Sequence, residues 1–274
     1  MGRSAGGQQA AAAGAWPKIS RKAGLKAERL LGDQLMLVPG VLTVSEAQAL
    51  IDAAERAGFS HQGSRGAAYG EAFRDNDRIQ FPDAALAAQL WDNGGLAPLF
   101  DGISVDGERA VGLNDNIRLY RYRAGQKFGK HIDDSVEVGP GRATRYTLLV
   151  YLSGQDPSSS ASSGSGAGDG ARAAAAAPAA AAAAAGGRPK RAPAGKHAAA
   201  APPPPPCACA VQPLQGGQTI FYGDRGRVLA SVAPRPGLAL LHLHGEDRCM
   251  EHEAAAVAAG TKYVLRSDVV FSAA

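Results

Sequence analysis

Residues 130–134 read KHIDD, and two of these residues, His131 and Asp133, can bind a metal ion together. On a β-strand, side chains two residues apart point to the same face, so the imidazole and the carboxylate can meet at one point. A mononuclear iron site needs two imidazoles and one carboxylate on one side of the metal, with the other side open. The stretch therefore supplies two of three ligands. For an isolated His-x-Asp pair, a hydrogen-bonded surface pair is the ordinary alternative.

A second histidine must come from elsewhere in the chain, which offers His61, His197, His242, His244 and His252. His61 lies in Gly/Ser-rich sequence that we expect to form a loop, and His197 lies in a low-complexity tract. His242 and His244 share one face of an expected strand. For that pair, a place in the core or beside the ligands is the more common outcome than metal ligation.

The sequence after His252 favours it as the third ligand. Gly260 can form the turn into the final strand, and Lys262 opens that strand ten residues after the histidine. A buried cation there suits an anionic co-substrate that binds the metal and extends away from it, because its far carboxylate needs a paired charge. Arg266 has the same strand parity and is the second candidate for this role. Asp134 is a weaker candidate for metal ligand than its neighbour, because its side chain should point away from the shared face.

Two helices are expected before the strands that carry these residues. Thr43 and Glu46 form a capping-box pattern, apolar residues then recur at helical spacing, and Gly58 can end the helix. A second helix is expected after Pro82. The segment 74–78, RDNDR, is polar and rich in turn-forming residues, so we expect a loop that faces substrate or solvent.

From residue 116 onwards the hydrophobic period changes from 3.6 to 2. β-branched and aromatic residues bounded by Gly, Pro or Asp predict strands over 116–122, 145–153, 218–223, 238–244 and 262–272. Helices followed by strands, with no helices between the strands, favour an antiparallel β core with helical support.

Composition predicts three parts. We expect residues 1–34 to be a flexible N-terminal segment and residues 154–210, rich in Ala, Pro, Gly and Ser, to be a disordered insertion, because such sequence offers little to a core. Residues 35–153 and 211–274 should form one domain, since strands of one sheet lie on both sides of the insertion. The insertion is tolerated because the cost of loop closure grows only logarithmically with length. A spacer is the simpler interpretation of it, and a partner-binding segment is the alternative.

The net charge of +4 and the pI of about 9.0 at first suggest a nucleic-acid partner. However, residues 1–27 contain five basic residues and no acidic one, and residues 155–210 carry a net charge of +3. About −4 is therefore left on the rest of the chain. This distribution disfavours a nucleic-acid partner for the folded part.

Cysteine content and the N-terminal sequence give expectations about the location of the protein. A disulfide framework needs more cysteines than the three in this chain, which are Cys207, Cys209 and Cys249. The C-x-C pair also lacks the four ligands of a structural zinc site. We therefore expect an intracellular, cytoplasmic or nuclear protein. The N-terminal sequence has no apolar secretory region, but it is basic and free of acidic residues, which leaves organelle targeting as an alternative. No membrane span is expected.

Five segments together resemble the iron(II)/2-oxoglutarate-dependent dioxygenases of the prolyl 4-hydroxylase type. They are YRAGQKFGKHID (122–133), TLLVYLS (147–153), GGQTIFYG (216–223), PRPGLALLHLH (234–244) and HEAAAVAAGTKYVLRSDV (252–269). The H-x-D pattern alone is a weak signal, but its occurrence in order with GGxTxF and HxxxxVxxGxK is specific. The resemblance covers about residues 36–153 and 211–272. It implies a mainly β protein with a double-stranded β-helix, a jelly roll with the metal between its two sheets, supported by N-terminal helices.

The resemblance also implies residue roles. His131, Asp133 and His252 would hold iron(II), and Lys262 would pair with the distal carboxylate of 2-oxoglutarate. Tyr151, which should face inward, would donate to that same carboxylate.

Other roles follow from the same resemblance. Tyr122 would approach the metal-bound end of the co-substrate, while Gly216 and Gly217 would let the backbone turn tightly into the next strand. Tyr122 and Tyr151 are as readily explained as core aromatic residues, and Phe221 is more readily a core residue than a site residue.

The implied cofactors are Fe(II), 2-oxoglutarate and O2, with ascorbate as a further candidate. The implied reaction is hydroxylation of a C–H bond, with succinate and carbon dioxide as co-products and a protein prolyl side chain as the first substrate to consider. Two alternatives remain open: an oxygenase that acts on a small molecule or a nucleic-acid base, and a non-catalytic jelly-roll binding module. The sequence specifies neither the substrate nor the oligomeric state.

Overall fold

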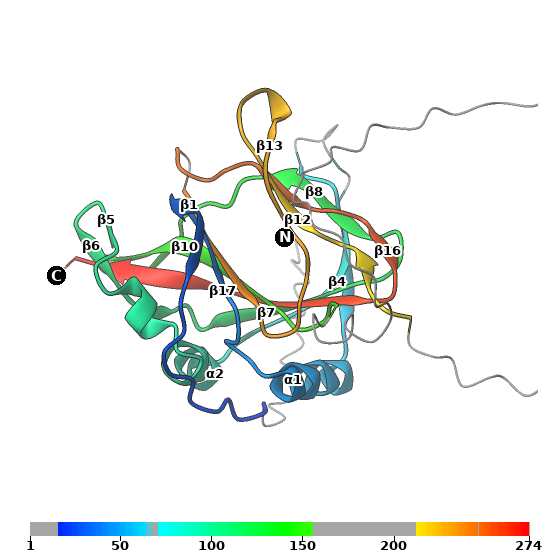
Figure 1. The fold of residues 1–274 in the computed structure, drawn as a ribbon, viewed down its shortest axis with the longest axis horizontal. Coiled ribbons are helices and arrows are strands. Elements are labelled where there is room, and N and C mark those ends of the chain that lie inside the picture. The colour runs from blue at the N-terminus through cyan, green and yellow to red at the C-terminus, as the bar shows by residue number, and fades with distance from the viewer. Residues whose placement is uncertain (1–15, 65, 67–70, 156–211, 246, 274) are drawn as a thin grey trace, which may run out of the picture. The chain divides into compact units, whose positions relative to one another are not determined.

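The computed structural model describes residues 16–64, 66, 71–155, 212–245 and 247–273. Most of the described strands belong to one large sheet that curls around on itself (Figure 1). The strands are β1 (Glu28–Asp33), β2 (Leu35–Val38), β3 (Ser60–Gly63), β4 (Arg74–Pro82), β5 (Ser104–Val105), β6 (Glu108–Leu113), β7 (Asn116–Tyr122), β8 (Lys127–His131), β9 (Glu137–Gly139), β10 (Arg142–Tyr151), β11 (Gln215–Gly216), β12 (Thr219–Tyr222), β13 (Val228–Val232), β14 (Ala239–Leu243), β15 (His252–Ala254), β16 (Val257–Ala259) and β17 (Lys262–Ser272).

Eight of these strands form a double-stranded β-helix. One sheet has the order β7-β17-β10-β14, the other has the order β8-β15-β12-β13, and β4 joins them by pairing with both β7 and β8. All pairings within the two sheets are antiparallel. This strand order is that of a jelly roll. The prediction of a mainly β, jelly-roll fold is therefore confirmed, and the five strands predicted from the sequence are all present.

The strand β4 corrects one prediction. Residues 74–78, expected to form a loop, are the first half of β4 and pair with β3, β7 and β8. One of these polar residues, Asp77, is held by partners on the neighbouring strands β3 and β7. Asp77, which is buried, accepts hydrogen bonds from Arg121 Nε (3.0 Å) and Nη2 (2.8 Å). His61, also expected in a loop, lies on β3 with its Nδ1 3.2 Å from the same carboxylate.

The N-terminal segment also departs from the prediction in its described part. Residues 28–33 form β1, which pairs with β2. Ile19 is buried in the core, and Trp16 stacks on Phe81 with ring centroids 4.6 Å apart. These apolar side chains hold the segment against the domain, so the described residues 16–34 are structured. Residues 1–15, and residues 156–210 of the insertion, lie outside the described part of the chain.

The first helix, α1 (Val44–Ala57), begins and ends where the sequence predicts. The backbone N–H of Glu46 donates to Thr43 Oγ1 (3.1 Å), and the Thr43 N–H donates to the Glu46 carboxylate (2.7 Å), which completes the capping box. Gly58 ends the helix with a φ of 85°. The second helical region consists of α2 (Ala84–Ala88) and a π-helical turn, η2 (Gln89–Asn93), and two short 3-10 turns follow at η3 (Ala97–Phe100) and η5 (Asp224–Gly226). No helix in the described residues is long and apolar enough to cross a membrane.

The sheet of β7, β17, β10 and β14 has a hydrophobic core on each face. On one face, Leu148 and Leu265 pack with Leu50 of α1, and Figure 1 shows the helices α1 and α2 on that side. On the other face, Val264 and Tyr151 pack with residues of the second sheet. Successive residues of a strand alternate between the two faces. The inward face of β17 therefore also carries Lys262 and Arg266, and both are held on a strand whose two faces are packed.

Candidate metal and co-substrate site

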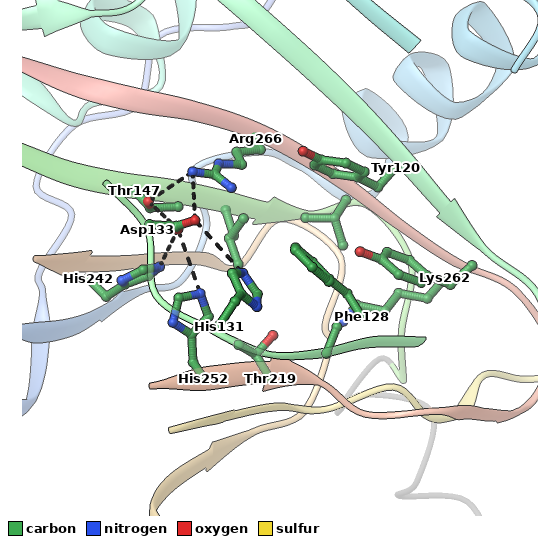
Figure 2. Close-up of a pocket in the computed structure, with 14 residues that line it drawn as sticks. Tyr120, Phe128, His131, Asp133, Thr147, Thr219, His242, His252, Lys262 and Arg266 are labelled. Atoms are coloured by element: carbon green, nitrogen blue, oxygen red, sulfur yellow. Dashed lines mark hydrogen bonds and ion pairs between the residues drawn. The ribbon is translucent and has the colours of Figure 1, made fainter. Parts of the chain in front are cut away.

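Strand pairing brings His131, Asp133 and His252 together. β8 and β15 pair so that His131 lies opposite His252, and the imidazole centroids are 4.3 Å apart. Asp133 follows β8 and turns back toward both rings (Figure 2). One ligand atom from each of the three residues lies within 4.8 Å of the others. The three residues named from the sequence thus meet at one point between the two sheets.

Hydrogen bonds orient both imidazoles for metal binding. His131 Nδ1 lies 2.8 Å from the carbonyl oxygen of Gly129, and His252 Nδ1 lies 2.9 Å from that of Met250. A carbonyl only accepts, so each Nδ1 carries the proton and each Nε2 keeps its lone pair. These Nε2 atoms lie 3.8 Å and 3.6 Å from oxygens of Asp133. A metal-binding histidine usually donates its other ring N–H to such a partner, so this donor set fits a divalent metal ion.

The protonation states of the three residues also fit a metal site. Burial, together with the neighbouring His252, lowers the pKa of His131 to about 4. Burial likewise lowers the pKa of His252. Burial alone would raise the pKa of Asp133, but the charge of Arg266 and the surrounding histidines hold it well below its ordinary value. Two neutral imidazoles and a carboxylate are the forms that bind a metal without first losing a proton.

A chain of hydrogen bonds fixes the Asp133 carboxylate. Thr147 Oγ1 donates to Asp133 Oδ2 (2.7 Å) and accepts from His244 Nδ1 (3.0 Å), while His244 Nε2 lies 3.0 Å from Thr144 Oγ1. The single hydroxyl proton of Thr147 goes to the carboxylate, so His244 must donate from Nδ1 and accept at Nε2. Every buried polar atom of this chain has a partner, and the carboxylate is held in one orientation.

Replacing Thr147 by valine should weaken metal binding. The change removes the donor to Asp133 and leaves the buried His244 N–H unpaired. We expect metal affinity to fall about 10- to 100-fold and the free energy of unfolding to fall by about 2 kcal/mol. Calorimetric titration with Mn²⁺ and thermal unfolding would measure the two effects. Thr147→Ser keeps the hydroxyl and should retain most of the affinity; equal losses in both variants would show that the hydroxyl has no such role.

Lys262 lies at the other end of the same pocket (Figure 2) and is buried. Its Nζ donates to the carbonyl oxygen of Gly217 (2.6 Å), and no carboxylate among the described residues pairs with it. Burial lowers the pKa of its ammonium group to about 7. A buried cation without an anionic partner is costly, and an anionic ligand would remove this cost.

Arg266, the other candidate anchor, already has anionic partners. Its Nη2 lies 3.1 Å from Asp133 Oδ1 and 3.4 Å from Asp268 Oδ1. Arg266 thus contacts the carboxylate of the metal site, which sequence reasoning had not foreseen. Of the two cations on the inward face of β17, Lys262 is the one available for the distal carboxylate of a co-substrate.

The two tyrosines lie near Lys262. Tyr122 is opposite Lys262 in the β7–β17 pairing, with the lysine Nζ 5.4 Å from the ring centroid. Tyr122 also lines the pocket, and its approach to the metal-bound end of the co-substrate stays a prediction. Tyr151 faces inward as expected, 5.6 Å from Nζ, but its hydroxyl donates to Thr219 Oγ1 (2.7 Å). Phe221 is fully buried in the inner core, where we expected it.

Gly216 and Gly217 make the turn that presents a carbonyl to Lys262. Their φ angles are +75° and +71°, which residues other than glycine rarely adopt. A Cβ on Gly216 would lie 2.6 Å from the carbonyl oxygen of Ala256. The turn therefore needs glycine for both its backbone angle and the close approach of β16.

Replacing Gly216 by alanine should lower the free energy of unfolding by at least about 2 kcal/mol, because strain at positive φ adds to the clash with Ala256. Urea unfolding would measure the loss. The matched control is Gly102→Ala, since Gly102 has a φ of +87° and no atom within 4 Å of its would-be Cβ. The clash is disproved if the two variants lose equal stability.

His242 was expected in the core or beside the ligands. It is fully buried, and its Nε2 lies 3.5 Å from Asp133 Oδ2, so three imidazoles surround this carboxylate (Figure 2). The β10–β14 register places His242 opposite Thr147. Neither of its ring nitrogens has a hydrogen-bond partner within the described structure. His242 is thus the one imidazole around Asp133 that the protein does not hold by a hydrogen bond.

Comparison with protein-family models and with curated proteins finds no match. Among solved structures, the chain is similar to the viral collagen prolyl hydroxylase of Paramecium bursaria Chlorella virus-1 in complex with 2OG, with 14% identity, a TM-score of 0.48, and 88% of this chain and 97% of that chain covered. It is also similar to a prolyl-4-hydroxylase of Pseudomonas putida, with 13% identity, a TM-score of 0.49 and coverage of 88% and 94%. A third is the prolyl hydroxylase of Trichoplax adhaerens in complex with a hypoxia inducible factor peptide fragment, with 13% identity, a TM-score of 0.48 and coverage of 88% and 85%. Because the sequence identities and TM-scores are low, the fold assignment rests on the strand order. The functional assignment rests on the residues of the site.

Proposed function

We propose that the protein is an iron(II)- and 2-oxoglutarate-dependent dioxygenase that hydroxylates a C–H bond. One observation carries the proposal. A single pocket between the two sheets holds, at one end, two imidazoles whose Nε2 atoms face a carboxylate and, at the other end, a buried lysine without an anionic partner. The first group suits a divalent metal ion, and the second suits the far carboxylate of an elongated dianion.

Iron(II), when bound, would supply the activation of oxygen, coupled to conversion of 2-oxoglutarate to succinate and carbon dioxide. The protein's part is to bind and orient. His131, Asp133 and His252 would hold the ion from one side, which leaves the other side for the co-substrate and oxygen. The hydrogen bond from Thr147 keeps Asp133 in position.

Lys262 would bind and align the co-substrate. Arg266 balances the charge of Asp133, so the lysine remains to pair with an incoming carboxylate. Between the two ends, Tyr120, Phe128 and Leu149 line the pocket. These walls are mainly apolar and would limit the access of water to the reacting groups.

The affinity for 2-oxoglutarate should depend on pH through Lys262. The folded protein holds the pKa of this lysine at about 7, below its ordinary value, whereas a bound carboxylate favours the charged form. Affinity should therefore be constant below pH 7 and fall by up to about tenfold per pH unit above it, with uptake of a proton on binding. Titration calorimetry of the Mn²⁺-loaded protein in buffers of different ionisation enthalpy would measure the affinity for 2-oxoglutarate and the number of protons taken up. Affinity that is unchanged from pH 6 to pH 9 would contradict this role.

A protein prolyl side chain is the first substrate that we propose, on the strength of the motif resemblance. Incubation of proline-containing peptides with the protein, Fe(II), 2-oxoglutarate and ascorbate should give a product heavier by one oxygen atom. Omission of ascorbate would show whether it is needed. If succinate forms but no peptide gains oxygen, the substrate is of another class, such as a small molecule or a nucleic-acid base.

Release of succinate from 2-oxoglutarate tests the activity itself. We expect iron-dependent succinate formation by the wild-type protein and none by His131→Ala. Iron-dependent oxygen consumption should change in parallel. Equal succinate formation by both proteins would remove the enzyme proposal, and no succinate from either protein would favour a binding module.

A further inference from the structure

A second group of metal-binding side chains overlaps the first. His242, Cys249 and His252 each place one ligand atom within 4.8 Å of the other two. The imidazoles of His242 and His252 lie 4.5 Å apart, centroid to centroid, and Cys249 Sγ is 4.0 Å from His252 Nδ1. In tetrahedral zinc sites, Zn–S is about 2.3 Å and Zn–N about 2.0 Å, so ligand atoms lie about 3.5 Å apart. Small side-chain movements would bring these three atoms to that spacing.

His242 gives independent support for a ligand at this place. It is fully buried, and in the described structure both of its ring nitrogens are without a hydrogen-bond partner. Buried polar groups nearly always have a partner, and a buried orphan calls for one. The metal site of His131, Asp133 and His252 does not use this imidazole. A metal ion bound with Cys249 would give one of these two nitrogens a partner.

Cys249 is held in place beside the metal-binding segment. The backbone N–H of Asp133 donates to Cys249 Sγ (3.1 Å), and the N–H of Gly245 donates to the Asp133 carbonyl (3.0 Å). The turn is closed by a further bond from the Cys249 N–H to the Gly245 carbonyl (2.9 Å). These contacts fix the sulfur next to the histidines, although Cys249 itself is only partly buried.

We propose that His242, Cys249 and His252 form a second metal site that takes a thiophilic cation such as Zn²⁺, and that this site and the iron site cannot be filled together because both need His252. Binding at His252 Nδ1 would form metal–sulfur and metal–nitrogen bonds and release the thiol proton to solvent. The ring proton would move from Nδ1, where it is donated to the Met250 carbonyl, to Nε2, so that Nε2 could no longer bind iron. Thiolate ligands favour zinc over iron(II) relative to a carboxylate, so the two sets differ in the metal that they prefer. The fourth position would stay open to water, as in a site with three protein ligands.

Cobalt(II) is a direct probe, because a thiolate bound to Co²⁺ gives a near-ultraviolet charge-transfer band that imidazoles and carboxylates do not give. Addition of Co²⁺ to the metal-free protein under argon should produce this band. Cys249→Ser and His242→Phe should abolish it. His131→Ala should keep it, because His131 belongs only to the other set. Circular dichroism would show that each variant is folded.

The other cysteines of the chain provide the matched control. The double variant Cys207→Ser/Cys209→Ser should keep the band at full strength. A band that persists in Cys249→Ser, or that is absent from the wild-type protein, would overturn the proposal. A band that disappears in His131→Ala would also overturn it, since the thiolate would then belong to the iron site. None of these readouts uses catalysis, so they are independent of the proposed activity.

The competition between the two sites rests on the proposed function and needs a separate test. Zn²⁺ should inhibit iron-dependent succinate formation by the wild-type protein. In Cys249→Ser, at least about tenfold more Zn²⁺ should be required for the same inhibition, because zinc loses a ligand while the iron site stays intact. Equal inhibition of both proteins would refute the claim that the two metal sites cannot be filled together, even if the cobalt band shows that the second site exists.

Discussion

Replacing Asp133 by asparagine is expected to abolish iron-dependent succinate formation, with a loss of roughly a thousandfold or more. The carboxylate is the one anionic ligand of the proposed metal site. Losing it would remove on the order of 4 kcal/mol of metal-derived stabilisation, and each 1.36 kcal/mol corresponds to about tenfold in rate. Binding of Mn²⁺, measured by calorimetry, should be lost in parallel.

The same change should also destabilise the metal-free protein. Asp133, which is buried, lies 3.1 Å from Arg266, whose side chain is 13% exposed, and removal of one partner from such an ion pair costs about 3 kcal/mol. His131→Ala separates the loss of metal binding from the loss of stability. Among the described residues, Asp133 is the one buried charge that this histidine contacts. We expect His131→Ala to lose metal binding with a much smaller loss of stability. Asp133→Asn would contradict the site if it bound Mn²⁺ as tightly as the wild-type protein does.

Replacing Lys262 by methionine should lower the affinity for 2-oxoglutarate by about a hundredfold or more, which corresponds to the 2–5 kcal/mol that a buried charge pair typically loses when one partner is removed. Metal binding should be unchanged, because the lysine lies at the other end of the pocket (Figure 2). The ligand-free protein should lose little stability, because removal of a cation buried without an anionic partner offsets the loss of the hydrogen bond to the Gly217 carbonyl. Calorimetry on the Mn²⁺-loaded protein and thermal unfolding would measure these effects.

Two variants make the Lys262 prediction specific. Lys262→Arg keeps the positive charge and should recover part of the affinity, and the pH dependence above pH 7 should disappear in Lys262→Met. Arg266→Met tests the other cation of β17. If the arginine variant loses 2-oxoglutarate binding while Lys262→Met retains it, then Arg266 is the anchor and the assignment of roles on this strand is reversed.

Strand patterns in the sequence predicted the antiparallel β core with helical support, and the motif resemblance implied the jelly roll. The strands β7, β10 and β17 are 7, 10 and 11 residues long and rich in β-branched and aromatic residues, and α1 carries a capping box. β4 and β15 could not be predicted in this way. β4 begins with five polar residues, of which Asp77 is held by a partner far away in the chain, Arg121, and β15 is three residues long. Both strands depend on tertiary contacts, which local patterns do not reveal.

For the site, spacing was informative where the residues share a strand or follow a motif. His131, Asp133 and Lys262 were found in this way, and the structure gathers them with His252 around one pocket. The contact between Arg266 and Asp133 was not foreseen. It depends on how two strands distant in sequence lie across the interior of the jelly roll, and strand parity alone does not give this.

The hydrogen-bond chain through Thr147 and His244, and the position of Cys249 beside His252, were missed for a related reason. Threonine on a strand is ordinary, and a single cysteine has no signature. The one usable signal was the spacing of His242 and His244, which predicted that both share one face of the expected strand over 238–244, but the sequence could not show which residues they would meet.

The central claim is that His131, Asp133 and His252 bind a single ion, and anomalous diffraction from a crystal grown with Mn²⁺ and 2-oxoglutarate tests it most directly. The account predicts one strong anomalous peak about 2.0–2.2 Å from both Nε2 atoms and from an oxygen of Asp133. It also predicts the far carboxylate of 2-oxoglutarate at Lys262. A crystal with no peak between the two sheets, or with a peak bound by other residues, would contradict the account.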